Sequence, residues 1–287
     1  MIGMALDIAS GAAIVQIGAK AHAALRRSGG KLAPLSSSAE TGYCLAGDEI
    51  VWVGSPRHPM HPRAVQIGER CLQGDRFDVA GCTPWRPAAV RAGVPASVLR
   101  ANCHLLRANI VRIGEPKGFG AMLAGGEPDF PLDLAKPYVR EVAAGIAEDE
   151  PNRLVEAALR LLGFGPGLTP SGDDFVGAVL FAKHLLRHEE ETSSTWEWAA
   201  RTLAAEAKLR SNVISAALFA DLADGQSFAP LHSLAQTMAA ATFGPDAIPA
   251  ARAVVAIGHS SGWDMLAGLI VGITGTFDHQ ECGGLPT

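Results

Sequence analysis

The chain has 287 residues, of which 48% are hydrophobic and 18% charged, and its formal net charge is −5. This composition is typical of a globular protein with a substantial core, and the length allows one large domain or two ordinary ones. The negative charge, with no basic stripe of interleaved aromatic residues, argues against nucleic acid or an anionic membrane surface as a partner.

The cysteines and the apolar segments bear on the compartment. The five cysteines are odd in number and contain no C-x-x-C, so neither a disulfide framework nor a zinc knuckle is indicated. Asp7 interrupts the apolar N-terminal stretch, and the basic residues follow it, which is the reverse of a secretory signal. The apolar run at 265–277 is shorter than the roughly 20 residues that a membrane helix needs. We therefore expect a cytoplasmic protein without a membrane span.

The segment between about residues 30 and 80 has the signals of β-strands. Apolar and β-branched residues at 43–45, 50–53 and 64–67 predict three strands, and Ala-Gly-Asp at 46–48 predicts the turn between the first two. This part of the chain is expected to be β-rich.

The pattern changes from Pro95 onward. Apolar residues fall on one helical stripe between 98 and 106, and Gly and Pro then crowd the segment from 114 to 131. We place the domain boundary there, which gives a β-rich N-terminal domain at 1–130 and a helical domain at 131–287.

After Pro137 nearly every segment is helical in pattern. Glycines at 225, 244 and 258 mark helix ends, and Ser211 and Asp246 mark helix starts. The predicted helices cover about 138–148, 152–162, 172–188, 195–209, 212–224, 231–242, 247–257 and 262–275. The expected fold class is α+β, with a β-rich N-terminal part followed by a mostly α-helical C-terminal array.

Two segments about ninety residues apart are nearly the same. Ser-Gly-Asp-Asp at 171–174 and Ser-Gly-Trp-Asp at 261–264 each follow an apolar run that ends in glycine, and each opens another helix. The two stretches are the internal repeat of this chain. If both helix starts face each other, they build one polar pocket.

A capping box explains part of the repeated pattern without a ligand. In that motif a serine hydroxyl and a carboxylate three residues later satisfy free backbone N–H groups at a helix start. This accounts for Asp174 and Asp264 taken singly. It does not account for the glycine after each serine, for the second carboxylate at Asp173, or for the glycine-rich loop at 164–170.

Those extra features favour a ligand site. Backbone N–H groups at a helix start, together with the helix dipole, bind phosphate or carboxylate. The adjacent carboxylates would repel such an anion unless the ligand also has an amide or ureido end, or unless a divalent cation such as Mg²⁺ bridges the charges. The sequence leaves both alternatives open. The predicted anion-binding residues are Gly165, Gly167, Thr169, Ser171 and Gly172 in the first motif, with Ser261 and Gly262 in the second.

Two further side chains are candidates beside the motifs. Arg210 lies just before a polar helix start and is a natural partner for an anion, although an ordinary cap with solvated charges explains it equally. His259 lies beside the second motif, where it could act as an acid or base near neutral pH or serve only a structural role.

The run from Gly163 to Asp174, followed by Gly258 to Asp264, resembles a bacterial family of domains of unknown function. That family includes the third subunit of oxamate carbamoyltransferase, an enzyme of anaerobic allantoin breakdown. The resemblance covers chiefly the C-terminal half of the chain.

The resemblance implies a cytoplasmic enzyme subunit that acts with two different partner chains. Its substrates are oxalurate and phosphate, and its products are oxamate and carbamoyl phosphate. The positions that match the family's motifs are Gly165, Gly167, Thr169, Ser171, Gly172, Asp173 and Asp174, with His259, Ser261, Gly262 and Asp264 from the second motif.

Three hypotheses follow. In the first, the glycine loop and Ser171 hold phosphate or the developing oxyanion while Asp173 or Asp264 orients the ureido N–H groups. In the second, the chain is a non-catalytic scaffold or ligand-binding subunit whose motifs only cap helices. In the third, Asp173, Asp174 and Asp264 hold Mg²⁺ in a hydrolase.

Overall fold

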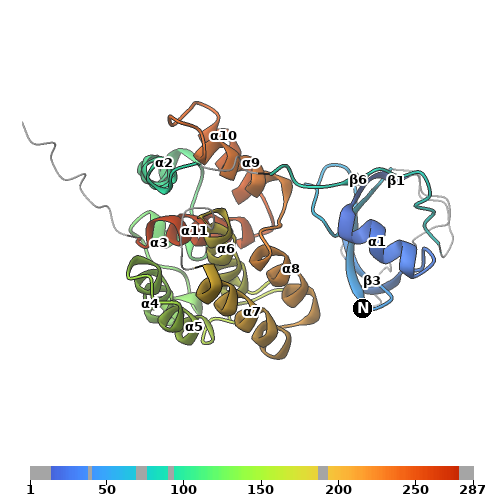
Figure 1. Cartoon of the computed structure of the whole chain (residues 1–287), viewed down its shortest axis with the longest axis horizontal. Coiled ribbons are helices and arrows are strands. Elements are labelled where there is room, and N and C mark those ends of the chain that lie inside the picture. Colours follow the sequence, from blue (N-terminus) through green and yellow to red (C-terminus); the bar gives the residue numbers. More distant parts are fainter. Residues whose placement is uncertain (1–13, 38–40, 69–75, 90–93, 187–192, 278–287) are drawn as a thin grey trace, which may run out of the picture. The chain divides into compact units, whose positions relative to one another are not determined.

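The computed structural model describes residues 14–37, 41–68, 76–89, 94–186 and 193–277 (Figure 1). The chain divides into two compact units. The first comprises Met1–Ala88 with Ser227–Ala229, and the second comprises Ala89–Gln226 with Pro230–Thr287. The boundary near residue 130 that the sequence suggested falls inside the second unit, because the helical segment Ala96–Ala108 packs against the C-terminal helices.

The first unit is built on a six-stranded sheet of mixed direction. Its strands follow the order β2-β3-β4-β5-β1-β6, in which β4–β5 and β1–β6 pair in parallel and the other neighbours are antiparallel. The strands are β1 (Ile14–Gly18), β2 (Ala33–Ser37), β3 (Thr41–Ala46), β4 (Glu49–Gly54), β5 (Ala64–Ile67) and β6 (Pro84–Trp85).

Helix α1 (Ala19–Arg27) belongs to the core of this unit. Its Ala21, Ala24 and Leu25 recur at helical spacing and are buried in one cluster with Val51 of β4 and Val65 of β5. The three strands predicted at 43–45, 50–53 and 64–67 are confirmed as parts of β3, β4 and β5.

The second unit is helical. Its elements are α2 (Ala96–Ala108), η1 (Ile110–Arg112), α3 (Gly120–Leu123), η2 (Leu132–Ala135), α4 (Lys136–Ala147), α5 (Pro151–Ala158), α6 (Ser171–Leu186), α7 (Ser193–Arg210), α8 (Val213–Ala223), α9 (Ala229–Met238), α10 (Ala247–Val255) and α11 (Ser261–Thr274). The eight helices predicted after Pro137 are confirmed, with ends that differ by a few residues. The α+β fold class is confirmed as well.

Helices α6 and α11 form the centre of the second unit and are buried over almost their whole length. Glycines let the two backbones approach closely. A Cβ at Gly268 would overlap the carbonyl oxygen of Phe175, and a Cβ at Gly272 would lie 2.8 Å from the carbonyl oxygen of Val179. The contacts advance together along both helices, so the two helix starts lie at the same end. Among the described residues, no helix is both long and apolar enough to cross a membrane.

Candidate functional site

The two repeated motifs meet at the starts of α6 and α11. The hydroxyls of Thr169 and Ser261 are 2.9 Å apart and hydrogen-bonded, although 92 positions separate them in the chain. The relation is reciprocal. The Ser261 hydroxyl lies close enough to Asp174 to lower its pKa, and the Ser171 hydroxyl acts in the same way on Asp264. Each aspartate therefore lies beside the serine of the other motif.

Neither motif forms the capping box that its spacing allows. Helix α6 begins at Ser171 itself, so the residue before it is Pro170, which has no side-chain acceptor. The N-cap of α11 is Ser260, and this residue makes no side-chain capping hydrogen bond. Pro170 and Ser260 serve instead through their carbonyl oxygens, which accept from the amides of Asp174 and Asp264. Helix capping therefore leaves both aspartate side chains unexplained.

The glycine after each serine has a packing role. A Cβ at Gly172 would overlap the carbonyl oxygen of Leu161, and a Cβ at Gly262 would overlap that of Val254. In both motifs the new helix thus starts directly against the end of the preceding helical segment. These two glycines, predicted as ligand-binding residues, lie in backbone contacts that only glycine permits.

Asp173 is buried and fully engaged by protein donors. One carboxylate oxygen accepts from the amide of Gly163 at 2.7 Å. The other accepts from the hydroxyls of Ser215, at 2.6 Å, and Ser211. Asp173 therefore joins the start of α6 to the start of α8 and to Gly163, the glycine that ends the preceding helical segment.

The start of α8 supports the glycine loop. Asn212 is the N-cap of α8, and its side-chain oxygen accepts from the amides of Ile214 and Ser215, both at 3.0 Å. Its side-chain nitrogen donates to the carbonyl oxygen of Leu168 at 2.9 Å. The predicted helix start at Ser211 is thus one residue early, because Ser211 serves Asp173 instead.

Asp174 and Asp264 form a buried carboxyl pair. The Oδ2 atoms of both side chains are buried and lack a hydrogen-bond partner among the described residues. Burial raises the pKa of Asp264 to about 7. Burial, and then the charge of Asp264, raises the pKa of Asp174 well above its usual range. At neutral pH the pair therefore holds at least one proton, because two adjacent buried carboxylates cannot both ionise cheaply.

A third segment reaches this pair, and sequence reasoning missed it. The amide of Phe119 donates to Oδ1 of Asp264 at 2.7 Å, which opposes the effect of burial on that pKa. A Cβ at Gly118, whose φ is +53°, would overlap the carboxylate of Asp264. The glycine-rich stretch after residue 114 carries the only signal that could have suggested this role.

The glycine loop at 164–170 is the part of the site nearest to solvent. Gly165 has φ +118° and its Cβ position faces the amide of Ser171, whereas Gly167 has φ +95° and open space around it. Pro166, Gly167 and Leu168 are exposed, and Thr169 is half-buried beside Ser261. The loop is thus the exposed part of the site. The hydroxyls of Thr169 and Ser261 are the next groups inward, and the carboxyls of Asp174 and Asp264 are the buried part.

Arg210 and His259 do not join the carboxyl pair. The Arg210 guanidinium donates to Glu206 at 2.7 Å within α7, and it is the Arg210 carbonyl oxygen that lies against Gly163. His259 is exposed in the turn before α11. Their predicted roles in binding and acid–base chemistry therefore gain no geometric support from the contacts of these side chains.

The three aspartates do not converge as a metal site would require. Asp173 is directed to the α8 start, and only Asp174 and Asp264 are left as a pair. Within the described ranges, no group of three or more His, Cys, Asp and Glu side chains is arranged to hold a metal ion. One or two carboxylates are the usual protein ligands of Mg²⁺, which completes its octahedron with waters and substrate phosphates, so the Asp174–Asp264 pair alone keeps the Mg²⁺ alternative open.

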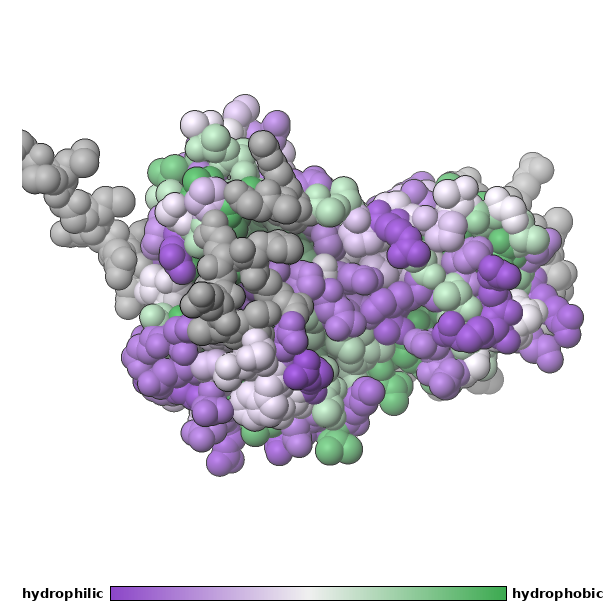
Figure 2. All heavy atoms as spheres, in the orientation of Figure 1, coloured by the Kyte–Doolittle hydropathy of each residue, from purple (hydrophilic) through white to green (hydrophobic). Residues whose placement is uncertain are grey.

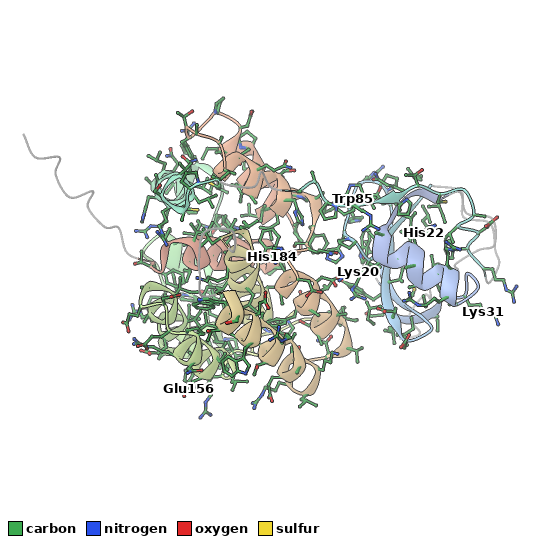
Figure 3. All side chains as sticks on the ribbon, viewed as in Figure 1. Lys20, His22, Lys31, Trp85, Glu156 and His184 are labelled. Carbon is green, nitrogen blue, oxygen red and sulfur yellow. The ribbon has the colours of Figure 1, made fainter. Side chains whose placement is uncertain are left out.

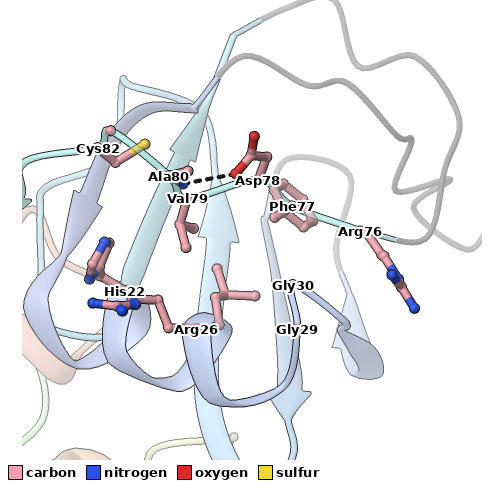
Figure 4. A pocket seen from close by; sticks show the side chains of 12 residues that line it. His22, Arg26, Gly29, Gly30, Arg76, Phe77, Asp78, Val79, Ala80 and Cys82 are labelled. Atoms are coloured by element: carbon pink, nitrogen blue, oxygen red, sulfur yellow. Dashed lines mark hydrogen bonds between the residues drawn. The ribbon is translucent and has the colours of Figure 1, made fainter.

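Other chemistry-bearing groups lie apart from the motifs. The first unit has a cavity of about 620 Å³ lined by His22 and Arg26 of α1 and by residues 76–82 (Figure 4). There Asp78 accepts from the amide of Ala80 at 2.8 Å, while Arg76 is directed outward in the view. In the second unit His184 lies on α6 and Glu156 on α5 (Figure 3). Neither group is among the residues that surround the carboxyl pair.

Comparison with known proteins bears on the same region. Residues 161–273 match the family described as oxamate carbamoyltransferase subunit AllH. No curated protein and no solved structure matches the chain. The matched range contains both motifs and runs from the glycine loop almost to the end of α11. The C-terminal part of this chain is therefore similar to the oxamate carbamoyltransferase subunit AllH family, as the resemblance of the two motifs had indicated.

Proposed function

We propose that this chain is a subunit of a cytoplasmic carbamoyltransferase of allantoin nitrogen breakdown. The reaction converts oxalurate and phosphate to oxamate and carbamoyl phosphate, and its site lies at the paired starts of α6 and α11. One observation carries the proposal. Two buried carboxyl oxygens, on Asp174 and Asp264, have no hydrogen-bond partner among the residues that the structure describes, at the point where an exposed glycine loop and two hydroxyls meet.

The chemistry of the substrates suits this arrangement. Oxalurate and oxamate carry a carboxylate at one end and N–H groups at the other. Unpartnered carboxyl oxygens accept N–H donors, and backbone amides of the glycine loop attract an anion. The amides of Gly172, Asp173 and Asp174 already donate to carbonyl oxygens, so the loop supplies the N–H groups for the anion. The ligand would therefore lie with its amide end on Asp174 and Asp264 and its anionic end toward Gly167 and Thr169.

The carboxyl pair can also move the proton that the reaction requires. A phosphate oxygen attacks the ureido carbonyl carbon, a C–O bond forms, and the C–N bond to the oxamate nitrogen breaks. Phosphate loses one proton and the leaving nitrogen gains one. An ionised Asp264 would accept the first, and a protonated Asp174 would supply the second. The pair then passes a proton internally and returns to its starting state.

Asp173 has a different role in this proposal. Its oxygens already accept three hydrogen bonds from protein groups. It fixes the glycine stop and the α8 start, and through them the loop that binds the anion. The role of orienting the ureido group passes to Asp174 and Asp264.

The test is an assay of the assembled enzyme in the reverse direction. The chain is combined with its partner subunits, carbamoyl phosphate and oxamate are supplied, and phosphate release is measured. Asp264→Asn, which keeps the side-chain shape but cannot ionise, should lower kcat by about 10²-fold or more. Asp246→Asn, at an exposed position before α10, should have no effect. Absence of oxamate-dependent release with wild type, or full activity of Asp264→Asn, would reject the proposal.

A non-catalytic scaffold is the second candidate, and the engagement of Asp173 favours it. The three hydrogen bonds of Asp173 and the tight packing at Gly172 and Gly262 would hold a helical array together without a ligand. Thermal shifts with phosphate and with oxamate separate the two. A scaffold gives no shift, whereas a ligand site gives a shift that Asp264→Asn abolishes.

A further inference from the structure

The cavity of the first unit has the size and the fixed walls of a small-molecule site (Figure 4). Its volume of about 620 Å³ lies within the usual range for ligand pockets. One wall is a face of α1, and the other is the segment 76–82. The amide of Phe77 donates to the carbonyl oxygen of Gly30 at 2.8 Å, and a Cβ at Gly30, whose φ is +79°, would overlap the carbonyl oxygen of Phe77. The two walls are therefore held together before any ligand binds.

Positively charged side chains line this cavity. His22 and Arg26 are four positions apart on α1, so both leave the same face of the helix, and they extend in the same direction in Figure 4. Arg76 lies on the opposite wall and is directed outward. Within the described part of the chain neither guanidinium forms an ion pair, whereas Arg27 pairs with Glu49 at 3.3 Å. The cavity thus has cationic groups whose charge is not compensated.

The remaining walls of the cavity are mainly apolar. Among the described residues that line it, Asp78 is the only acid, and one of its oxygens accepts from the amide of Ala80 at 2.8 Å. Leu25, Phe77 and Val79 also line the cavity and belong to the core cluster of this unit. Elsewhere, hydrophilic residues cover much of the face seen in Figure 2, and apolar ones form small separate groups. A concave site that combines cations with apolar side chains is suited to a small organic anion.

We infer that this cavity binds a small organic anion, which is a carboxylate or a phosphate monoester with an apolar body. The Arg26 guanidinium donates to the oxygens of the anion in the paired geometry that suits both groups, and the His22 imidazole donates to the same group. Arg76 adds attraction from the opposite wall. These residues lie before the range 161–273 that matches the family, so the inference does not depend on the proposed function.

The ligand class is tested by ligand-observed NMR titration of the purified full chain with benzoate, phenyl phosphate and benzamide. Benzamide has the shape of benzoate without its charge, so it should bind at least about tenfold more weakly. Tighter binding of phenyl phosphate than of benzoate would assign a phosphate monoester, and the reverse order would assign a carboxylate. Equal affinity for benzoate and benzamide, or no binding of either anion at about 10 mM, would overturn the inference, because the arginines would then be ordinary solvated charges.

The location of the site is tested by substitution. Arg26→Gln should weaken binding of the anion about tenfold or more, because hydrogen bonds between charged groups are lost. Arg86→Gln is the matched control, since Arg86 is exposed in the same unit but does not line the cavity. Asp78→Asn keeps an oxygen for the Ala80 amide and removes the negative charge, so it should strengthen binding about twofold to fivefold. Unchanged binding by Arg26→Gln, or weaker binding by Asp78→Asn, would contradict an anion in this cavity.

All three substituted side chains are exposed, and circular dichroism verifies that the variants fold. Asp264→Asn should bind both anions as wild type does, because its carboxyl belongs to the second unit. Binding that is lost in Asp264→Asn but kept in Arg26→Gln would place the anion at the starts of α6 and α11 and would overturn the inference. The titrations need no partner subunit, so their result is separate from that of the carbamoyl-transfer assay.

Discussion

Replacing Asp264 with asparagine should change how the stability of the helical unit depends on pH. Burial raises the pKa of Asp264 from 3.8 to about 7, so the folded protein binds a proton that the unfolded chain releases. Stability from this protonated form is fully present below pH 3.8 and is lost as the pH rises through 7. Asparagine resembles the protonated carboxyl in shape and hydrogen bonding, and it does not titrate.

The magnitude follows from the pKa change. Each unit between the folded and unfolded pKa corresponds to about 1.4 kcal/mol. Between pH 5 and pH 8 wild type should therefore lose about 2.5 kcal/mol of unfolding free energy through Asp264. Asp264→Asn should not lose this part. The difference in stability between the two proteins should move by that amount in favour of the variant as the pH rises.

The assay is urea unfolding followed by far-ultraviolet circular dichroism, which reports chiefly on the helices, at pH 5, 6, 7 and 8. Titrating groups remote from Asp264 cancel when the variant is subtracted from wild type. Asp174 does not cancel, because the charge of Asp264 raises its pKa, so the difference reports on the pair. Asp246→Asn, at an exposed position, is the control and should follow wild type at every pH. Parallel profiles for wild type and Asp264→Asn would show that the Asp264 carboxyl ionises normally in the folded protein, and the argument for a proton-holding pair would fail.

Three further predictions concern stability. Gly172→Ala and Gly262→Ala should each lower the free energy of unfolding in urea by about 1–3 kcal/mol, because the new Cβ overlaps a backbone carbonyl oxygen. Gly244→Ala, with open space around it, should be near neutral. Equal effects at the three positions would contradict the packing role. Asp173→Ala leaves one buried donor and two half-buried donors without this acceptor, so it should lower the free energy of unfolding by about 3 kcal/mol, against almost nothing for Asp246→Ala. Burial, and then the charge of His184, lowers the pKa of His232 from 6.5 to about 4. The free energy of unfolding of wild type should therefore fall by about 2 kcal/mol between pH 7 and pH 5, because the unfolded chain binds a proton there that the folded protein does not. His232→Gln should not show this fall. A constant difference between His232→Gln and wild type over that range would refute the last prediction.

Local patterns in the sequence were sufficient to predict where most helices of the helical unit begin and end. Glycine stops at Gly163, Gly225 and Gly258 have positive φ, as helix ends with a left-handed residue require. Apolar periodicity between these stops fixed helices α4 to α11 to within a few residues. The same approach missed β1 and α1, because a short strand followed by an alanine-rich helix has the composition of a uniformly apolar N-terminus.

The repeated Ser-Gly-x-Asp stretches also identified the place of the candidate site. The sequence by itself determined that two helices start with the same residues, that a glycine-rich loop precedes the first, and that acids lie where an anion would bind. These are properties of neighbouring residues, and local spacing is enough to recognise them.

Only the tertiary structure assigned different roles to chemically identical residues. Asp173 and Asp174 are adjacent, yet one meets three donors from Gly163, Ser211 and Ser215 while the other faces Asp264 across the α6–α11 contact. The amide of Phe119 comes from 145 positions away. Which acid becomes a structural anchor and which keeps a free oxygen depends on the groups that long-range packing brings within hydrogen-bonding distance, and local spacing carries no information about them.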